Sequence, residues 1–426
     1  MASPPSKKQK TGAEQPGSPA TTSFPKSKIK ILLLENVAPS GINKLKEEGF
    51  QVQTETKALT EAELLDRIED LHVLGIRSKT KVTEAVLRKA KRLLCVACFC
   101  IGTDQVDLQV AQECGIPVFN APFANTRSVA ELVLGEVICL ARQLGDKTME
   151  LHKGTWNKLA KGCCEVRGKT LGMIGYGHIG SQLSVLAEQF GMKIVYYDII
   201  PKLPMGNATQ LDTMEAVLST ADFVSLHVPN LPSTVNLITA TQINQMKKGS
   251  YLINASRGKV VDLDALAAAL KSGHVAGAAV DVYPWEPEKN GPGFVTPLQG
   301  CPNTIMTPHI GGSTLEAQSK IGDEVAFSIT KVINTGSTIG SVNFPQVDLP
   351  QEPGRHRILN IHKNVPGVLR TINEIVGNVG ANIEGEMLVT KGQVGYLIMD
   401  TDQTHSAKVL KAIRELDSSL RTRVLY

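Results

Sequence analysis

The sequence predicts an α/β protein in which parallel sheets are covered by helices on both faces, followed by a smaller α/β unit at the C-terminus. Three observations lead to this prediction. Short apolar strands alternate with helices from residue 29 onward, a glycine-rich turn joins a strand to a helix at 171–180, and residues 357–426 follow the order βαββαβ. A length of 426 residues suits about two to four domains.

The first block, 29–101, alternates strands with helices. We expect strands at 29–34, 73–76 and 93–101, and helices at 42–48, 61–69 and 83–92. This alternation favours a parallel sheet with helices on both faces. Cys95, Cys98 and Cys100 lie in the last strand and are expected to be buried rather than to bind a metal, because no second ligand cluster lies nearby.

A second alternating block begins with a long helix at 129–144. Ser128 and Glu131 have the spacing of a capping box, and so do Ser313 and Glu316 before a later helix. Between these two helices we expect parallel strands at 171–174, 193–197, 224–227, 251–254 and 278–282.

The pattern changes after the proline-rich stretch 345–353. We expect strands at 357–363, 382–390, 393–400 and 420–426, with helices at 366–378 and 405–416. The resulting order βαββαβ is that of the ferredoxin-like split unit. A segment of roughly 70 residues is large enough for a small core of its own.

Composition is that of an ordinary globular protein. The chain is 42% hydrophobic and 20% charged, and its net charge is +4. This near balance gives no reason to expect nucleic-acid or membrane binding, so any anion site must be local. No apolar run approaches the roughly 18 residues of a membrane-spanning helix. The irregular spacing of the eight cysteines indicates a reducing compartment, so we expect a cytoplasmic protein.

The N-terminal segment 1–26 is rich in Pro, Ser, Thr, Gly and Lys and carries few large apolar side chains. Such a composition predicts a disordered tail. Lys7, Lys8 and Lys10 fit either a weak nuclear-import patch or an ordinary solvated segment.

The most informative local motif is the turn at 175–180, which opens a helix near Ile179. In such a turn Gly175 allows the sharp bend, Gly177 lets the backbone approach a pyrophosphate, and Gly180 lets the helix pack close to the strand. The helix then presents free N–H groups to the phosphates. Glycines also punctuate many turns that bind nothing, but this strand–turn–helix context favours a dinucleotide site.

Asp198 follows the strand at 193–197. A carboxylate at this place accepts hydrogen bonds from the adenosine ribose and repels a 2′-phosphate, which favours NAD over NADP as the cofactor. On its own, Asp198 could equally be a turn residue at the end of a strand.

Three polar residues, Arg257, Glu286 and His309, follow later strands of the same block. Because ligands bind outside the carboxyl ends of strands in open α/β sheets, these side chains are expected to converge at the nicotinamide end of the cofactor. Taken singly, each has an ordinary explanation as a surface, turn or loop residue. Their joint position after a dinucleotide motif favours a catalytic site.

Hydride removal from a 2-hydroxy acid requires three groups of this kind. His309, with an ordinary pKa of about 6.5, can accept the hydroxyl proton. Glu286 can orient the imidazole and stabilise its cationic form, which raises the pKa. Arg257 can hold the substrate carboxylate with its planar guanidinium.

The chain resembles the D-isomer-specific 2-hydroxyacid dehydrogenase family. Four motifs in order carry the resemblance, namely the turn at 175–180 with Asp198, and the segments 254–258, 281–287 and 307–312. The resemblance covers 28–426. It extends to the short members with one C-terminal ACT domain, which oxidise 3-phosphoglycerate with NAD in serine biosynthesis.

This resemblance implies a Rossmann-like NAD-binding domain at 125–311, inserted in a flavodoxin-like substrate-binding domain at 27–124 and 312–350, and an ACT domain at 355–426. It assigns Arg257, Glu286 and His309 the catalytic roles given above. It implies cofactor contacts at Gly175, Gly177, His178, Ile179, Gly180, Asp198, Ala255, Ser256, Arg257, Asp281, His309, Ile310, Gly311 and Gly312.

Substrate contacts are implied in the same way at Arg77, Ser78, Asn125 and Lys158. Lys158 would otherwise be a solvated linker lysine. Trp156 lies beside it in a polar segment and is expected to anchor a subunit contact. The oligomer that the resemblance implies is a homotetramer.

In the family, serine binds the ACT domain across a subunit interface as an allosteric ligand. The matching residues are His362, Asn364 and Asn382, whose imidazole and amide groups can hydrogen-bond an amino acid. Without a ligand they would be turn formers at strand ends. Position 360 is Asn where some relatives carry His, which leaves the strength of serine inhibition open.

Two alternatives remain at this point. One is an NAD(H)-sensing transcriptional corepressor of the same fold, which Lys7–Lys10 would suit and the segment 355–426 argues against. The other keeps the enzyme and changes its substrate to glycerate, formate or hydroxyglutarate. A side activity that reduces 2-oxoglutarate to 2-hydroxyglutarate is also expected.

Overall fold

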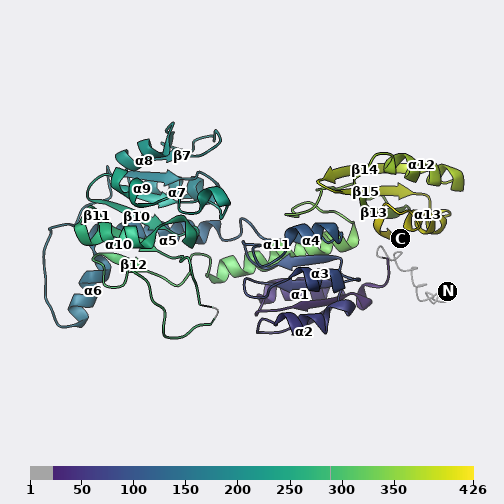
Figure 1. Cartoon of the computed structure of the whole chain (residues 1–426), viewed down its shortest axis with the longest axis horizontal. Helices are drawn as coiled ribbons and strands as arrows, with labels where there is room; N and C mark the ends of the chain where they lie inside the picture. Colours follow the sequence, from purple (N-terminus) through teal and green to yellow (C-terminus); the bar gives the residue numbers. More distant parts are fainter. Residues whose placement is uncertain (1–22, 288) are drawn as a thin grey trace, which may run out of the picture.

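The protein, described here as a computed structural model for residues 23–287 and 289–426, contains three separate sheets in three lobes (Figure 1). In Figure 1 the lobe with seven strands lies on the left, the lobe with five strands in the middle, and the C-terminal lobe on the right. Lys7, Lys8 and Lys10 and nearly all of the predicted tail fall outside the described residues. The predicted α/β fold class is confirmed.

The five-stranded lobe is a parallel sheet in the order β2-β1-β3-β4-β5, which is the flavodoxin-like order. Three of its strands and three of its four helices were predicted within a few residues, whereas α4 and the strands β2 and β5 were not predicted. Its elements are η1 (Lys26–Lys28), β1 (Lys30–Leu33), α1 (Pro39–Glu47), β2 (Gln51–Thr54), α2 (Glu61–Leu65), η2 (Ile68–Asp70), β3 (Val73–Ile76), α3 (Glu84–Lys89), β4 (Cys95–Cys98), α4 (Leu108–Glu113) and β5 (Val118–Phe119).

A helix from much later in the chain, α11 (Leu315–Asn334), completes this lobe (Figure 1). Its buried residues Ile321, Val325 and Ile329 belong to the same apolar core as β1. It also crosses α1 at very short range, because a Cβ on Gly41 would lie 2.7 Å from the carbonyl oxygen of Gly322. The seven-stranded lobe is therefore an insertion between two parts of the five-stranded lobe.

The seven-stranded lobe is a parallel sheet in the order β12-β11-β10-β9-β6-β7-β8, the doubly wound Rossmann order with one added strand. The order in which the strands are added reverses between β6 and β9, which makes this pair the switch point of the sheet. Its elements are α5 (Thr126–Arg142), α6 (Leu144–His152), β6 (Thr170–Ile174), α7 (His178–Gln189), β7 (Lys193–Tyr197), β8 (Thr209–Gln210), α8 (Met214–Thr220), β9 (Phe223–Leu226), η3 (Pro232–Thr234), α9 (Ala240–Gln245), β10 (Ser250–Asn254), η4 (Gly258–Val260), α10 (Leu263–Ser272), β11 (Val275–Val280) and β12 (Thr304–Met306).

The two helix starts predicted from capping boxes are wrong. Helix α5 begins at Thr126, so Ser128 lies inside its first turn, and the Ser128 hydroxyl pairs with Thr314 Oγ1 at 2.8 Å instead of capping. Helix α11 is capped by Thr314, whose hydroxyl accepts a hydrogen bond from the backbone N–H of Ala317. The Ser128–Thr314 pair joins the two helix starts where the chain passes between the lobes.

The C-terminal lobe has the predicted order βαββαβ. It is an antiparallel sheet in the order β14-β15-β13-β16. Side chains alternate across it, so that Ile358 packs against the helices and Leu359 against the segment around Phe344. The elements are β13 (His356–Lys363), α12 (Val368–Val379), β14 (Ile383–Lys391), β15 (Val394–Thr401), α13 (Ser406–Arg414) and β16 (Ser419–Leu425).

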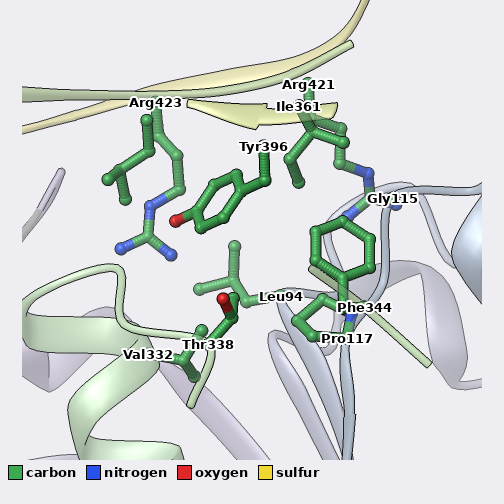
Figure 2. Close-up of a pocket in the computed structure, with 11 residues that line it drawn as sticks. Leu94, Gly115, Pro117, Val332, Thr338, Phe344, Ile361, Tyr396, Arg421 and Arg423 are labelled. Carbon is green, nitrogen blue, oxygen red and sulfur yellow. The ribbon is translucent and has the colours of Figure 1, made fainter. Parts of the chain in front are cut away.

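Three arginines, of which Arg357 is buried and the others half-buried, hold the C-terminal lobe to the rest of the chain. The Arg357 guanidinium forms two 2.7 Å hydrogen bonds to Asp400 and donates to the carbonyl oxygens of Thr335, Leu349 and Pro350. Arg421 and Arg423 of β16 donate to carbonyl oxygens of the five-stranded lobe, and both line a cavity of about 40 Å³ at this junction (Figure 2).

All eight cysteines are free thiols. Cys95 and Cys98 are buried as predicted, whereas Cys100 is only half-buried. Burial raises the pKa of Cys95 to about 12, so this thiol stays protonated. Across 23–287 and 289–426, no group of three or more His, Cys, Asp or Glu side chains is placed to hold a metal ion.

Candidate active site

The three glycines of the 175–180 turn have three different surroundings. Gly175 has φ of 91°, and a Cβ there would lie 2.4 Å from the carbonyl oxygen of His227. A Cβ on Gly180 would lie 2.8 Å from the carbonyl oxygen of Gly175. At Gly177, by contrast, a Cβ would meet nothing within 4 Å. Gly175 and Gly180 are therefore needed for packing, and Gly177 faces open space that a phosphate can approach.

This turn lies at the switch point of the sheet, between β6 and β9, with His178 as the first residue of α7. Such a crevice is where open α/β sheets bind nucleotides, and free N–H groups at the start of α7 suit a pyrophosphate. Ile179 is half-buried in this first turn. The exposed His178 ring lies 3.8 Å from the ring of Phe123, which precedes α5.

Asp198 follows β7 beside this crevice. Its Oδ2 accepts a hydrogen bond from the N–H of Tyr176 at 2.9 Å, and its Oδ1 accepts one from the N–H of Ile200 at 3.2 Å. The carboxylate is only half-buried and each oxygen keeps a free lone pair, so it can also accept from ribose hydroxyls. These residues fit NAD.

His309 and Glu286 form a direct pair, in which His309 Nδ1 lies 2.8 Å from Glu286 Oε2. The other carboxylate oxygen of Glu286 accepts a hydrogen bond from the N–H of Tyr283. The bond to Glu286 raises the pKa of His309 above its ordinary value, against the opposing effects of burial and of the charge on Arg257. Burial raises the pKa of Glu286, but its contacts with His309 outweigh this effect and the pKa is lowered overall.

Arg257 enters the site on the short segment that follows β10. Asn254 stabilises this segment, since its Nδ2 donates to the Arg257 carbonyl and its Oδ1 accepts from the N–H and the hydroxyl of Ser256. A Cβ on Gly258 would lie 1.9 Å from the carbonyl of Tyr283. Gly258 thus lets the Arg257 segment lie against the Glu286 segment, and the charge of Arg257 lowers the pKa of both His309 and Glu286.

Asp281, predicted as a cofactor contact, organises the His309 loop. It is 1% exposed, and its carboxylate accepts hydrogen bonds from the hydroxyl of Thr307 and from the N–H groups of Ile310 and Gly311 at 2.6 to 2.8 Å. His309 itself has φ of 55°, a left-handed conformation that is unusual for a non-glycine residue. Asp281 therefore stabilises a strained loop that presents the His309 ring.

Sequence reasoning missed Glu136, a buried acid in the middle of α5. It is 4% exposed, and neither of its carboxylate oxygens has a hydrogen-bond partner. Burial, with a further contribution from the charge of Asp281, raises the pKa of Glu136 to about 8. The acid is therefore mostly protonated at neutral pH and lies close to the carboxylate that holds the His309 loop.

Of the four candidates for substrate contacts, Lys158 lies apart from the other three. Arg77 and Ser78 lie in the loop after β3, and Asn125 immediately precedes α5, where its side chain touches Gly312. Lys158 lies in an exposed segment after α6, and in Figure 1 α6 points away from the five-stranded lobe.

The three candidates for serine binding are also separated within one chain. His362 is 3% exposed, and its Nδ1 pairs with Asn360 Oδ1 at 2.9 Å. Asn364 is exposed and follows β13, where its side chain donates to the Gly392 carbonyl. Asn382 is exposed at the start of β14, which adjoins the opposite end of β15. The register of β13, β15 and β14 places Asn382 about 30 Å from Asn364.

Comparison with known proteins agrees with this geometry. Residues 134–311 match the NAD-binding domain of the D-isomer-specific 2-hydroxyacid dehydrogenases, and 358–421 match an ACT domain of the AHAS small-subunit type. The crystal structure of a D-isomer-specific 2-hydroxyacid dehydrogenase from Lactobacillus delbrueckii ssp. bulgaricus, in its NAD-complexed form, covers 74% of this chain and all of its own. Its TM-score is 0.64 and its sequence identity 27%.

Two relatives match almost the whole length. A D-3-phosphoglycerate dehydrogenase of Dictyostelium discoideum is 57% identical over 406 residues, which are 95% of this chain and 99% of that protein. A D-3-phosphoglycerate dehydrogenase of Escherichia coli K12 is 50% identical over 410 residues, which are 96% of this chain and 100% of that protein. These relatives favour an enzyme over a transcriptional corepressor.

No helix in the described part of the chain combines the length and apolar character needed to cross a membrane. The chain is an NAD-dependent oxidoreductase. It belongs to the D-isomer-specific 2-hydroxyacid dehydrogenase family, among the D-3-phosphoglycerate dehydrogenases that carry a C-terminal ACT domain.

Proposed function

We propose the residue roles by which this chain oxidises 3-phosphoglycerate to 3-phosphohydroxypyruvate, the first step of serine biosynthesis. The observation that carries them is the 2.8 Å pair of His309 and Glu286 beside Arg257, at the edge of the sheet that carries the dinucleotide turn. His309 Nε2 accepts the proton of the C2 hydroxyl, and Glu286 stabilises the imidazolium that results. Arg257 holds the substrate carboxylate. NAD, when bound, accepts the hydride from C2.

The test is a substrate panel followed by NADH absorbance, with 3-phosphoglycerate, D-glycerate, formate and D-2-hydroxyglutarate. We expect 3-phosphoglycerate to have the highest kcat/KM. The variant His309→Ala should lose about 10²- to 10⁴-fold in kcat and bind NAD almost normally, whereas Lys271→Ala at an exposed position of α10 should behave as the parent. Normal turnover in His309→Ala would contradict the base assignment. The same assay with 2-oxoglutarate and NADH tests the proposed side activity.

Arg77, Ser78 and Asn125 are proposed to bind the substrate, in a substrate-binding domain formed by 27–124 and 312–350. The packing of α11 against β1 supports this division, which leaves 125–311 as the NAD-binding domain and 355–426 as the ACT domain. The test is Arg77→Ala, which should raise KM for 3-phosphoglycerate more than KM for D-glycerate. Equal effects on both substrates would count against a phosphate contact.

Lys158 is proposed to act in the site of a second copy of the chain. The segment around it exposes large apolar side chains, with Met149 57%, Trp156 80% and Leu159 61% exposed. Such a surface is suited to burial against a partner. With a second contact through the ACT domains, it supports the proposed homotetramer, which light scattering of the full chain can test. The free thiols support the expected cytoplasmic location.

Serine is proposed to bind between two ACT domains. Because Asn364 and Asn382 lie at opposite ends of the sheet, one chain cannot offer both to a small amino acid. Strands β14 and β16 are the two edges of the sheet, and β16 is held to the five-stranded lobe by Arg421 and Arg423. Pairing β14 with the β14 of a second copy about a two-fold axis would bring Asn364 near the partner's Asn382. This arrangement supports serine as a feedback inhibitor that acts through the subunit interface.

A further inference from the structure

A buried carboxylate organises the loop that carries Arg77. Glu35 follows β1 and is 7% exposed. Its Oε1 accepts hydrogen bonds from the N–H groups of Arg77 at 3.3 Å and Thr80 at 2.8 Å, and its Oε2 accepts one from the N–H of Lys79 at 3.0 Å. Three N–H groups that converge in a loop form a concavity that binds an anion, and here the anion is the Glu35 side chain.

The opposite side of the loop is held by Gln105. Its side chain is buried, and its Nε2 donates a 2.5 Å hydrogen bond to the carbonyl oxygen of Arg77. Both backbone groups of Arg77 are thus fixed by residues more than 25 positions away in sequence. The Arg77 side chain makes one long hydrogen bond, from Nη1 to the Glu35 carbonyl oxygen at 3.5 Å. Because this side chain is half-exposed and Ser78 is exposed, both can also contact a ligand.

The backbone at Glu35 is strained. Glu35 has φ of 65° and Asn36 has φ of 56°, two successive non-glycine residues in the left-handed region. Non-glycine residues persist in this region only where their surroundings enforce it, often at functional sites. Both lie at the end of β1 next to the end of β3, which is the switch point of this flavodoxin-like sheet and the usual place of its ligand.

We infer that Glu35 and Gln105 are positioning residues, which fix the loop 77–80 so that Arg77 and Ser78 meet the phosphate of the substrate. This inference rests on the proposed phosphate contact of Arg77. A merely structural role would predict equal losses on every substrate, whereas a positioning role predicts a loss that depends on the phosphate.

The test compares Glu35→Gln with the parent enzyme on 3-phosphoglycerate and on D-glycerate, which lacks the phosphate. A glutamine has one acceptor oxygen, so its NH2 group must face at least one of the three loop N–H groups. We expect KM for 3-phosphoglycerate to rise about tenfold, with kcat and the kcat/KM for D-glycerate within about twofold of the parent. Hydrogen exchange at Arg77, Lys79 and Thr80 should become faster. The control Glu47→Gln removes a negative charge from an exposed position in α1. It should leave KM and kcat unchanged for both substrates.

Two further variants keep the outcomes distinct. Gln105→Met removes the hydrogen bond to the Arg77 carbonyl and should also raise KM for 3-phosphoglycerate more than KM for D-glycerate. This variant tests the inference even if Glu35→Gln folds poorly. Arg77→Ala, measured in parallel, tests the phosphate contact itself. If Arg77→Ala is selective for the phosphorylated substrate while Glu35→Gln and Gln105→Met affect both substrates equally, the positioning role is wrong and the phosphate contact stands. If Arg77→Ala is not selective, the phosphate contact is wrong.

Discussion

At the scale of single residues, the proposed base His309 and its partner Glu286 should set the pH range of the reaction. As the proposed base, His309 must be neutral, and its pKa is raised by the bond to Glu286. Activity should therefore fall as pH decreases through a pKa above the ordinary value of 6.5. In Glu286→Gln the carboxylate charge is gone, so the acidic limb of log kcat/KM should move to lower pH while the maximal rate also decreases.

The measurement is kcat/KM for 3-phosphoglycerate against pH, at saturating NAD. Glu316→Gln, on the first turn of α11, removes an exposed carboxylate and should keep the parent profile. An acidic limb that stays in place or moves to higher pH in Glu286→Gln would show that Glu286 does not set the pKa of the base.

Glu136 makes a second residue-scale prediction, about stability. Its pKa is about 8 in the folded chain against a reference of 4.5, so the folded state holds a proton that the unfolded state releases. Stability should therefore fall as pH rises from about 4.5 to 8. Glu136→Gln keeps the shape without the titration and should be more stable than the parent by up to about 3 kcal/mol at pH 7, with little difference below pH 4.5.

Thermal unfolding of both proteins at several pH values checks this expectation. Glu131→Gln lies on the same helix but is exposed, so its curve should follow the parent. If the parent and Glu136→Gln show the same pH dependence, Glu136 is not a buried titrating acid.

At the scale of elements, two glycines in the turn between β6 and α7 have different roles, since Gly175 is needed for packing and Gly177 for the approach of the cofactor. Gly177 has an extended backbone and open space where a side chain would project, so Gly177→Val should leave the melting temperature within a few degrees but raise the Kd for NAD at least about tenfold. Gly175→Ala should instead destabilise the fold, because φ of 91° and the His227 carbonyl oppose any Cβ. Its melting temperature should be lower than that of the parent even without NAD.

NAD titration by fluorescence, together with thermal unfolding without NAD, distinguishes the two variants. A Gly177→Val protein that binds NAD normally would mean that the pyrophosphate does not approach this turn.

The elements also show which information is local in the sequence. The strands at 73–76 and 193–197 agree with the structure at both ends, because continuous apolar runs and glycine turns are local signals. The capping boxes failed because Ser128 bonds to Thr314, which is distant in the chain. Glu35 was missed for the same reason, since its partners lie 42 to 45 positions away. The only local sign was an acid directly after a buried strand.

At the scale of the whole molecule, function depends on segments that the chain brings together from a distance. Helix α11 returns to the first sheet after the seven-stranded lobe, and His309 lies just before that return. Arg357 and Arg423 tie the C-terminal lobe to the end of α11 through the carbonyls of Thr335 and Ile333. These bonds connect the ACT domain directly to the helix that follows the His309 loop. Sequence motifs predict each lobe, but these junctions have no local pattern.

The proposed serine site gives the last prediction, because Asn364 and Asn382 lie too far apart for one chain to offer both. Asn364→Ala and Asn382→Ala should each abolish serine inhibition, since every proposed site uses one residue from each copy. In a mixed pair, one of the two sites carries both substitutions and the other carries neither. Co-expressed or exchanged subunits of the two variants should therefore regain serine binding, with at most one intact site per ACT pair, measured by calorimetry and by inhibition at saturating substrate. Asn373→Ala, on α12 between these positions, serves as the control and should keep normal inhibition. If the mixture stays insensitive while each variant folds and turns over normally, the site does not combine Asn364 of one chain with Asn382 of its partner.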